Sequence, residues 1–343
     1  MTHAQLRWDP MLYGGAWVAS GRTAVQWALS SELLSADRTA GWIRKAGAAR
    51  GEQLGFRKLL SSAFIFFDGI EHQVARGSVS EAFSAREVLL KRNLLREWAD
   101  AVADSLPRGV PLDLVEHYAR KVPLKVMCHW MGVSVPDSPA LWAASHALAV
   151  FLERPNLHAG VADEARQAAQ LLTTSMGLAA PLTEAQIQQL MLFFAGLETT
   201  RHLLSVGLLV GLRDPQIWQT LVQESVAQAV VHRVLREYPP IRITGRRVKI
   251  GHEAFGQTLR RGELVIANLE SAGLPFGSGP HICLGAALTR TEAMTALQAL
   301  ARARPDLRLI KEPEPQAWLD GPLYSGLTEL WVSAAPDGPQ PSL

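Results

Sequence analysis

Apolar residues recur at intervals of three and four along most of the chain, which is the spacing of one face of an α-helix. The pattern predicts helices over residues 85–103, 112–131, 139–152, 165–176 and 182–212. A further helix is predicted in the segment DPQIWQTL, where Asp214 can cap the first turn and Pro215 takes the first helical position. We therefore expect most of the chain to be helical.

Stretches with strand character are few and short. They are AWVAS near the start, RRVKI and ELVIANL after the double proline, and LTELWVS near the end. No internal repeat, low-complexity linker or shift in composition divides the sequence. The prediction is a mainly α fold with a small β-sheet region, built as a single domain over residues 1–343 with a disordered tail at 336–343.

Composition and charge narrow the class of protein. Of the 343 residues 48% are hydrophobic, which is enough for a substantial core, and the formal net charge is only +2. No run of five or more basic residues occurs, so the electrostatic signature of a nucleic-acid-binding protein is missing. The first residues do not resemble a secretion signal, and no apolar run reaches the ~18 residues of a membrane span. We expect a cytoplasmic protein that binds no nucleic acid.

The chain has two cysteines, so a disulfide framework is not expected and each thiol needs its own explanation. Cys128 lies on an apolar helical pattern and is predicted to be part of the core. Cys283 lies in the loop LPFGSGPHICLG, where Gly277 and Gly279 allow backbone angles that other residues avoid. A helical pattern resumes at Cys283, and a helix N-terminus favours a thiolate because its partial positive charge lowers the thiol pKa.

Three kinds of chemistry could use such a thiolate. No cysteine-protease signature places a base beside Cys283, and a single sulfur cannot build a zinc or iron–sulfur site. One thiolate in a stiff glycine loop suits the axial ligand of a heme iron.

The segment FGSGPHICLG resembles the heme-binding loop of the cytochrome P450 family, whose pattern is Phe-Gly-x-Gly-x-His/Arg-x-Cys-x-Gly, and it matches every fixed position. The resemblance implies that Cys283 is the axial thiolate and metal ligand of heme b. It also implies that Phe276 shields the sulfur side, that His281 reaches a propionate, and that Gly277 and Gly285 let the chain lie against the ring.

A second segment, FFAGLETT, resembles the distal-helix signature Ala-Gly-x-Glu/Asp-Thr of the same family. The small Ala195 and Gly196 are expected to open space beside the helix for oxygen. Thr199 can return its hydroxyl to the carbonyl of Ala195 or hold a water. Glu198 is expected to supply protons from solvent, so Glu198 and Thr199 are the predicted catalytic residues.

Two further segments resemble parts of the family that contact the heme propionates. In DGIEHQVARGSVSEAF, His72 and Arg76 are four residues apart and share one helical face. In LREYPPIRITGRRV, Arg246 takes the position of the family's strand arginine. Alternation along the strand predicts that Arg247 points to the opposite face and is solvated.

The predicted substrate pocket is apolar on the distal helix and continues after the double proline, where the family's chains border the substrate. Arg242 could face inward and bind a carboxylate, or it could bind a propionate or solvent, and the sequence leaves these alternatives open. The pocket residues are Met191, Phe194, Ile241, Arg242 and Ile243.

The sequence departs from the family before the double proline. In HRVLREYPP, Arg236 is present but Arg233 stands in place of the glutamate of Glu-x-x-Arg. Two arginines three residues apart repel, so the family's usual ion network is not expected. The segment from GELVI to the heme loop leaves little room for the family's long meander, and the N-terminus and residues 154–182 also look short. We therefore expect a compact variant with a truncated N-terminus and meander, weaker heme retention, a more open lid and a poor fit to a standard ferredoxin.

The resemblance implies a heme-thiolate monooxygenase of bacterial secondary metabolism or catabolism. Such an enzyme takes electrons from NAD(P)H through a ferredoxin and ferredoxin reductase, activates O2, and oxidises a small apolar or amphipathic molecule that is free or presented on a carrier protein. Two alternatives stay open at this point: a heme enzyme that couples, desaturates or rearranges its substrate, and a non-enzymatic heme sensor. A monomer is expected.

Overall fold

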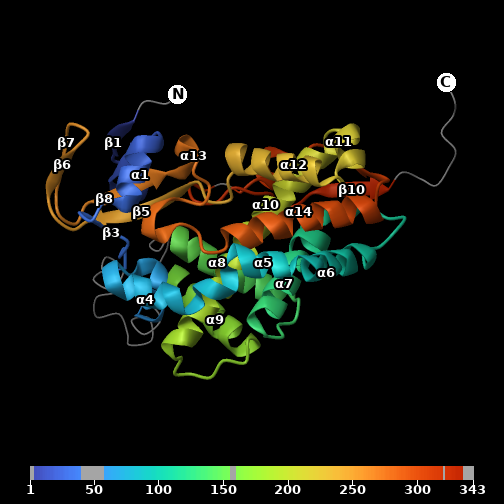
Figure 1. The fold of residues 1–343 in the computed structure, drawn as a ribbon, viewed down its shortest axis with the longest axis horizontal. Helices are drawn as coiled ribbons and strands as arrows, with labels where there is room; N and C mark the ends of the chain where they lie inside the picture. The colour runs from blue at the N-terminus through green and yellow to red at the C-terminus, as the bar shows by residue number, and fades with distance from the viewer. Residues whose placement is uncertain (1–3, 40–57, 155–159, 320, 335–343) are drawn as a thin grey trace.

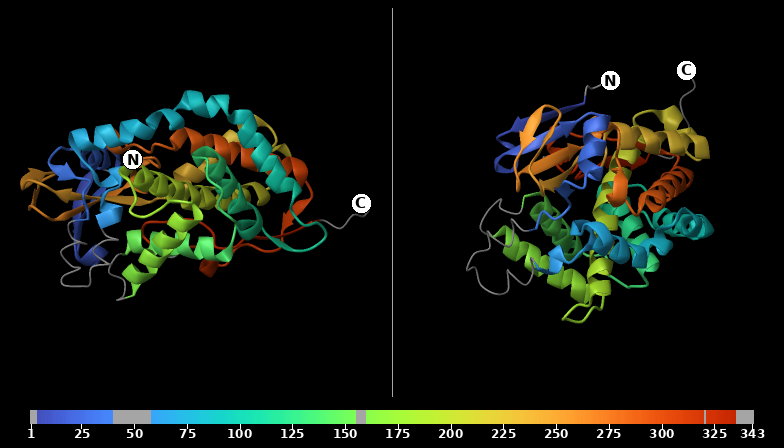
Figure 2. Two further views of the ribbon diagram at one scale, coloured as in Figure 1. Left: turned by 90° about the horizontal axis from the view of Figure 1, so that it is seen from below. Right: turned by 60° about the vertical axis from the view of Figure 1, so that its left-hand side comes forward.

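The computed structural model describes residues 4–39, 58–154, 160–319 and 321–334 (Figure 1). The tail predicted at 336–343 lies outside the described residues. Figures 1 and 2 show a β-rich end that carries the N-terminal strands and a larger helical body beside it. This arrangement confirms the prediction of a mainly helical fold with a small sheet region.

Helices make up most of the described chain. They are α1 (Arg22–Ser30), α4 (Gly69–Ser80), α5 (Ala85–Leu90), α6 (Arg92–Asp104), α7 (Lys121–Met131), α8 (Pro139–Glu153), α9 (Val161–Ser175), α10 (Glu184–Leu212), α11 (Pro215–Thr220), α12 (Glu224–Glu237), α13 (Leu269–Ala272) and α14 (Ala286–Ala303).

Two of the predicted helices are interrupted. The segment 85–103 divides at Lys91 into α5 and α6, and the segment 112–131 begins with a two-residue strand and a π-helical turn (Val115–Ala119) before α7. Periodicity shows which face of a segment is apolar, but it does not detect a short break that keeps the same face buried. The helix predicted from DPQIWQTL is confirmed, because Asp214 Oδ1 accepts the N–H groups of Gln216 and Ile217.

The sheets are small and gather distant parts of the chain. The five-stranded sheet has the order β1 (Gln5–Asp9), β2 (Ala16–Ser20), β8 (Leu264–Asn268), β5 (Ile243–Val248) and β3 (Leu34–Ser35). A three-stranded sheet has the order β4 (Leu112–Asp113), β10 (Trp331–Ala334) and β9 (Leu307–Leu309), and β6 (His252–Ala254) pairs with β7 (Gln257–Leu259). All four predicted strand segments are present, and the strands that were missed are mostly too short to show alternation.

Helix α10 is the centre of the helical body and packs against α7, α8, α12 and α14. It is 29 residues long, and nearly all of its second half is buried around the whole circumference. The side chains of a buried helix are held in place by the residues packed around them, whereas those at a surface can change rotamer. Side chains on α10 therefore have fixed directions relative to the helices around it.

The first turn of α10 carries a reciprocal cap. Thr183 Oγ1 accepts the backbone N–H of Gln186 at 3.3 Å, and Gln186 Oε1 accepts the backbone N–H of Thr183 at 2.9 Å. Both contacts satisfy N–H groups that have no partner inside the helix.

Removing this cap should destabilise the fold. We predict that Thr183→Ala lowers the free energy of unfolding by about 1 kcal/mol, because the N–H of Gln186 loses its acceptor. Thr183→Ser keeps the hydroxyl and should stay close to the original protein. Urea denaturation followed by circular dichroism measures the difference, and equal midpoints for the Ala and Ser variants would contradict the cap.

Candidate active site

Cys283 lies in the loop between α13 and α14, and the backbone of this loop is fixed at several points. The N–H of Cys283 donates to the carbonyl of Phe276 at 2.9 Å. Gly277 and Gly279 have φ angles of +69° and +72°, which favour glycine. A Cβ on Gly279 would also lie 2.6 Å from Ser30 Oγ in α1. The glycine spacing is therefore required both by the turn and by the contact with α1.

Two expectations about this cysteine are wrong. Helix α14 begins at Ala286 with Gly285 at its N-cap, so Cys283 precedes the helix instead of starting it. Burial by surrounding protein raises the pKa of the Cys283 thiol, and the N–H of Gly285, Arg76 and Arg290 offset this only in part. The end charge of a helix acts within its first turn, which the sulfur does not reach.

The predicted propionate ligands come together from three parts of the chain. The rings of His72 (α4) and His281 (loop) lie 3.9 Å apart between centroids, and Nε2 of His72 is buried without a hydrogen-bond partner. Arg246 on β5 is 6% exposed and donates to the carbonyl of Gly245. Arg76 leaves the same helix as His72 and donates to the carbonyl of Ile282, next to the cysteine, at 2.7 Å.

The positive charge among these side chains is on the arginines. Burial together with Arg246, His72 and Arg38 lowers the pKa of His281 to about 3, so this imidazole is neutral. Burial and the neighbouring Arg38 lower the pKa of Arg246 to about 10, so both arginines keep their charge. The acidic group that opposes these effects is Asp68, which raises the pKa of His281 and of Arg246. Among the described residues, this one carboxylate faces two buried arginines.

Heme b fits this site. Its two propionates would supply negative charge beside the buried arginines. They would also supply a hydrogen-bond acceptor for Nε2 of His72, which has no partner. Cys283 is an exposed residue by accessible surface, although protein atoms around its thiol raise the pKa, and Ala195 is exposed although it lies in the middle of the long helix α10. Both residues therefore face space that protein atoms do not fill. Arg38, which contributes to the charge but belongs to no motif, was missed by the sequence analysis.

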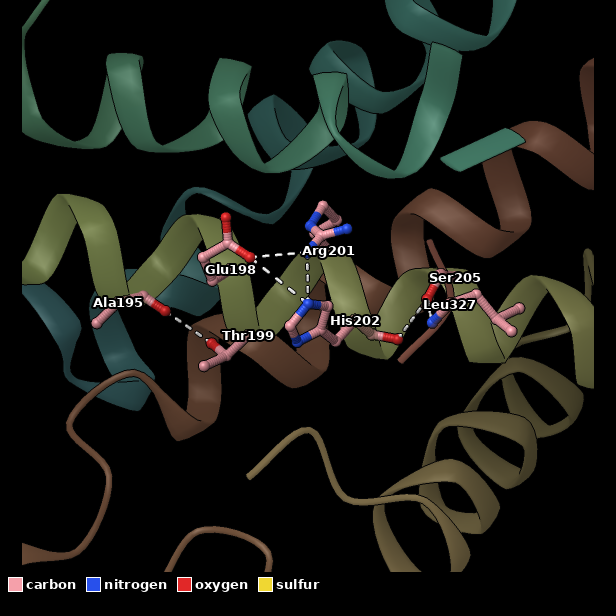
Figure 3. Close-up of polar contacts among 7 residues, drawn as sticks. All are labelled: Ala195, Glu198, Thr199, Arg201, His202, Ser205 and Leu327. Carbon is pink, nitrogen blue, oxygen red and sulfur yellow. Dashed lines mark hydrogen bonds and ion pairs between the residues drawn. The ribbon is translucent and has the colours of Figure 1, made fainter. Parts of the chain in front are cut away.

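The distal signature is only partly arranged as expected. The hydroxyl of Thr199 donates to the carbonyl of Ala195 at 2.7 Å, as predicted (Figure 3). Gly196 does not face the same space, because a Cβ there would lie 2.5 Å from the sulfur of Met127 in α7. This glycine makes room for helix packing, which is a correction to the expectation that both small residues serve oxygen.

Glu198 is buried and held in an ion pair. Arg201 donates to its Oε2 at 2.8 Å, and Nε2 of His202 lies 3.5 Å from the same oxygen (Figure 3). Burial alone would raise the pKa of Glu198, but the charge and hydrogen bond of Arg201, with His202 beside it, hold this pKa at about 2. Figure 3 shows that the side chains of Glu198 and Thr199 leave α10 on different sides. At neutral pH Glu198 is thus a carboxylate that can accept a proton but does not store one.

His202 is the buried partner that the sequence did not indicate. Burial and Arg201 lower its pKa to about 3, so the imidazole is neutral. It packs closely on the C-terminal segment, since a Cβ on Gly326 would lie 2.7 Å from the Cβ of His202. Nearby, Ser205 accepts the backbone N–H of Leu327 at 3.1 Å (Figure 3). These contacts join the C-terminal segment to α10.

A cavity of about 240 Å³ lies between α8, α10 and the C-terminal segment. Its lining includes Glu198 but none of the predicted pocket residues. Met191, Phe194 and Ile243 are buried, and Ile241 forms a β-bridge with Tyr324. The residues lining the cavity are His146, Ala149, Val150, Glu153, Arg154, Glu198, Arg201, His202, Leu319, Gly321 and Tyr324.

Arg242 takes a position that the sequence alternatives did not name. Its Nε lies 3.8 Å from Glu270, and its side chain is 39% exposed. The neighbouring Arg247, predicted to be solvated, is half-buried and donates to the carbonyl of Gly262 at 2.8 Å. Cys128, predicted to be in the core, is half-buried at the edge of the large hydrophobic cluster.

The two arginines of HRVLREYPP both bind one carboxylate. Arg233 donates to Glu237 Oε2 at 3.0 Å, and Arg236 donates to Glu237 Oε1 at 2.6 Å. The carboxylate of Glu237 therefore offsets the repulsion between the two arginines, and Glu237 lies outside the Glu-x-x-Arg pattern. Both arginines are more than half exposed, so this cluster is a surface feature.

Similar proteins are found by sequence and by structure. The chain is 27% identical to a vitamin D(3) 25-hydroxylase of Pseudonocardia autotrophica, over 79% of this chain and 78% of that protein. It is also 27% identical to a pentalenic acid synthase of Streptomyces avermitilis, over 94% of this chain and 90% of that protein. The ligand-free structure of CYP164A2 of Mycobacterium smegmatis has a TM-score of 0.76 and 26% identity, and covers 95% of this chain and 92% of that one.

A structure of P450BioI bound to an acyl carrier protein carrying hexadecenoic acid has a TM-score of 0.77 at 21% identity, covering 93% of this chain and 92% of that one. No protein-family model matches the sequence. The chain thus has the cytochrome P450 fold, as predicted, and its sequence is similar at about 27% identity to bacterial cytochrome P450 proteins. Within the part of the chain that the structure describes, no helix has the length and apolar content needed to cross a membrane.

The state of His202 gives a pH-dependent prediction. Its pKa is about 3 in the folded protein and near the ordinary value of ~6.5 in the unfolded chain, so between these values the unfolded chain binds more protons. The free energy of unfolding should fall as the pH falls from ~6.5 toward 3, by up to ~1.4 kcal/mol per pH unit.

His202→Phe should flatten this decline, whereas His232→Phe on the exposed side of α12 should retain it. Urea midpoints measured across the acid range distinguish the two variants. Parallel pH curves for His202→Phe and the original protein would show that His202 is not the group responsible.

Proposed function

We propose that this chain is a heme-thiolate monooxygenase that oxidises a small apolar or amphipathic organic molecule in bacterial secondary metabolism or catabolism. The observation that carries the proposal is the buried set of cations beside an exposed cysteine, because heme b supplies both the iron for the thiol and the carboxylates for the cations. The names of two relatives, a vitamin D(3) hydroxylase and a pentalenic acid synthase, support oxidation of a small molecule.

The proximal residues have distinct roles in this proposal. Cys283 would bind the iron through Sγ as a thiolate. Phe276 would cover the sulfur side, and the guanidinium of Arg290 lies 4.2 Å from the centre of its ring and holds it in place. Gly277 and Gly285 would leave the loop and the start of α14 close to the ring.

Four basic side chains would hold the propionates and fix the heme in one orientation. They are His72, Arg76, Arg246 and His281, and negative charge beside them would reverse the lowering of their pKa values. The bound heme would supply the activation of dioxygen. The small side chain of Ala195 would leave space on the distal side of the heme.

Thr199 and Glu198 are proposed to handle protons on α10. Thr199 Oγ1 donates to the carbonyl of Ala195, and a rotation about its Cα–Cβ bond would let the hydroxyl donate to a group on the distal side instead. Glu198 is ionised at neutral pH and can take up a proton from solvent only when its pairing with Arg201 loosens. In this proposal Glu198 relays protons and Thr199 presents them.

The electrons would come from NAD(P)H through a ferredoxin and its reductase, and the protein would act as a cytoplasmic monomer. The carrier-bound fatty acid in the P450BioI complex supports a substrate that is presented on a carrier protein. The short connection from β8 through α13 to the cysteine loop supports the proposal of a reduced meander and an altered donor surface.

The role of the sulfur can be tested directly. Cys283→Ser should remove the thiolate-type absorption band of the reduced, carbon-monoxide-bound protein, because an oxygen ligand donates less electron density to iron. Cys128→Ser is the matched control and should leave the band unchanged, since that thiol is on α7 and contacts the carbonyl of Val135. An unchanged spectrum in Cys283→Ser would refute the proposed function.

The role of Thr199 predicts a change in coupling. Thr199→Ala should divert the electrons of NAD(P)H from product to hydrogen peroxide and lower the product formed per electron pair by about tenfold or more. Thr199→Ser keeps the hydroxyl and should remain largely coupled. The yield of product per NAD(P)H consumed is the measurement, and equal yields in the Ala and Ser variants would rule out a role for the hydroxyl in delivering protons.

A further inference from the structure

The cavity between α8 and α10 is lined by one face of each helix, and the two faces lie opposite each other. Positions separated by three and four residues supply each face, so the arrangement follows from helical geometry. The C-terminal segment closes the space through Leu319, Gly321 and Tyr324. The α8 face consists of His146, Ala149, Val150 and Glu153 with the C-cap residue Arg154, and the α10 face consists of Glu198, Arg201 and His202.

Facing helix surfaces inside a protein are usually apolar, whereas this pair carries ionisable groups on both sides. The two carboxylates in the wall already have partners. Glu198 accepts from Arg201 at 2.8 Å, and Glu153 accepts the backbone N–H of Leu323 at 2.9 Å. The negative charges of the wall are therefore already engaged by groups of the protein.

The polar groups of the wall that lack partners are donors. Arg201 is 5% exposed and His202 is 1% exposed, and neither Nε of Arg201 nor Nδ1 of His202 has a hydrogen-bond partner. Nε2 of His202 lies 2.6 Å from the guanidinium of Arg201, which can only donate, so Nε2 is the acceptor and Nδ1 carries the proton. Buried N–H groups without an acceptor are costly and indicate a missing partner.

Tyr324 adds a third donor. Burial and the nearby Glu198 and Glu153 raise the pKa of its hydroxyl, which keeps the proton on the oxygen. The wall thus offers N–H and O–H groups beside the positive charges of Arg154 and Arg201. The donors in the wall that have no acceptor are Nε of Arg201 and Nδ1 of His202.

We propose that this cavity binds a carboxylate on the substrate, with Arg201 and His202 as hydrogen-bond donors and Arg154 as a second positive charge. A volume of about 240 Å³ suits a small carboxylic acid or the acidic end of a longer molecule. Thr199 does not line the cavity, but His202 follows it by three residues and lies on the same side of α10, so the apolar remainder of the molecule would extend along the helix toward Thr199. The identification of this ligand as the substrate rests on the proposed function.

The experiment compares four probes of one skeleton: phenylbutyrate, its methyl ester, phenylbutanol and phenylbutylamine. Isothermal titration calorimetry with the full-length protein measures their affinities without using the heme spectrum. The acid should bind roughly 10- to 100-fold more tightly than the other three, which is the range expected for hydrogen bonds to a charged group. An ester, alcohol or amine that binds as tightly as the acid would overturn the proposal.

Variants of His202 and Arg154 test which donors act. His202→Phe keeps a ring against Gly326 and removes the Nδ1 proton, so the preference for the acid should shrink several-fold. His202→Asn places an amide N–H where Nδ1 was and should restore much of it. Arg154→Gln should weaken the binding of the acid but not that of the ester. Arg154→Lys should retain most of the preference for the acid. An unchanged preference in both His202→Phe and Arg154→Gln would refute the assignment.

The location is tested by filling the space. Ala149→Leu places a larger side chain in the cavity and should weaken the acid at least tenfold, whereas Ala143→Leu, on the exposed side of the same helix, should not. Circular dichroism confirms that each variant is folded. Equal affinity in the two leucine variants would place the acid elsewhere.

The result separates this proposal from the proposed function. A protein that prefers the acid but shows no thiolate-type carbon monoxide band would lose the proposed function and keep the selectivity of the cavity. A protein with that band and no preference for the acid would lose the cavity assignment alone.

Discussion

Two buried arginines, Arg38 and Arg246, share one nearby carboxylate, Asp68, among the residues that the structure describes. Arg246 and His281 come from segments far apart in the sequence and meet His72 and Arg38 in a region where burial disfavours every charged form. Isolated buried cations are among the costliest groups a fold can contain, so such a cluster persists where a bound anion compensates it. Helix α4, strand β5 and the cysteine loop each bring a basic residue to this region, so their relative positions determine whether an anion can bind there.

Helix α10 also has two sides that differ in their chemistry. On one side Ala195 and Thr199 leave space next to a helical backbone, and on another Glu198 is paired with an arginine from the next turn. The pairing is intrahelical, so it does not depend on how helices α8 and α9 are placed. The carboxylate stays ionised while the neighbouring imidazole stays neutral, which gives the helix a fixed pattern of donors and acceptors along its length.

The sequence predicted the groups that belong to contiguous motifs and missed those that depend on tertiary contacts. The loop around Cys283, the bond from Thr199 to Ala195 and the four basic residues proposed to bind propionates belong to short patterns with fixed spacing. Arg38 and His202 could not be found in this way, because their importance comes from elements packed around them. The start of α14 was placed three residues too early, because a turn that precedes a helix keeps the helix's apolar spacing. The pairing of Arg233 and Arg236 with Glu237 was missed because the family pattern directs attention to a different position.

The contact between Gly279 and Ser30 ties the cysteine loop to α1, an element with no residue in any of the recognised motifs. The position of the Cys283 sulfur thus depends partly on where an N-terminal helix rests on the sheet. If the proposed heme is bound there, substitutions on the face of α1 that meets the loop would shift its reduction potential while the cysteine motif stays the same.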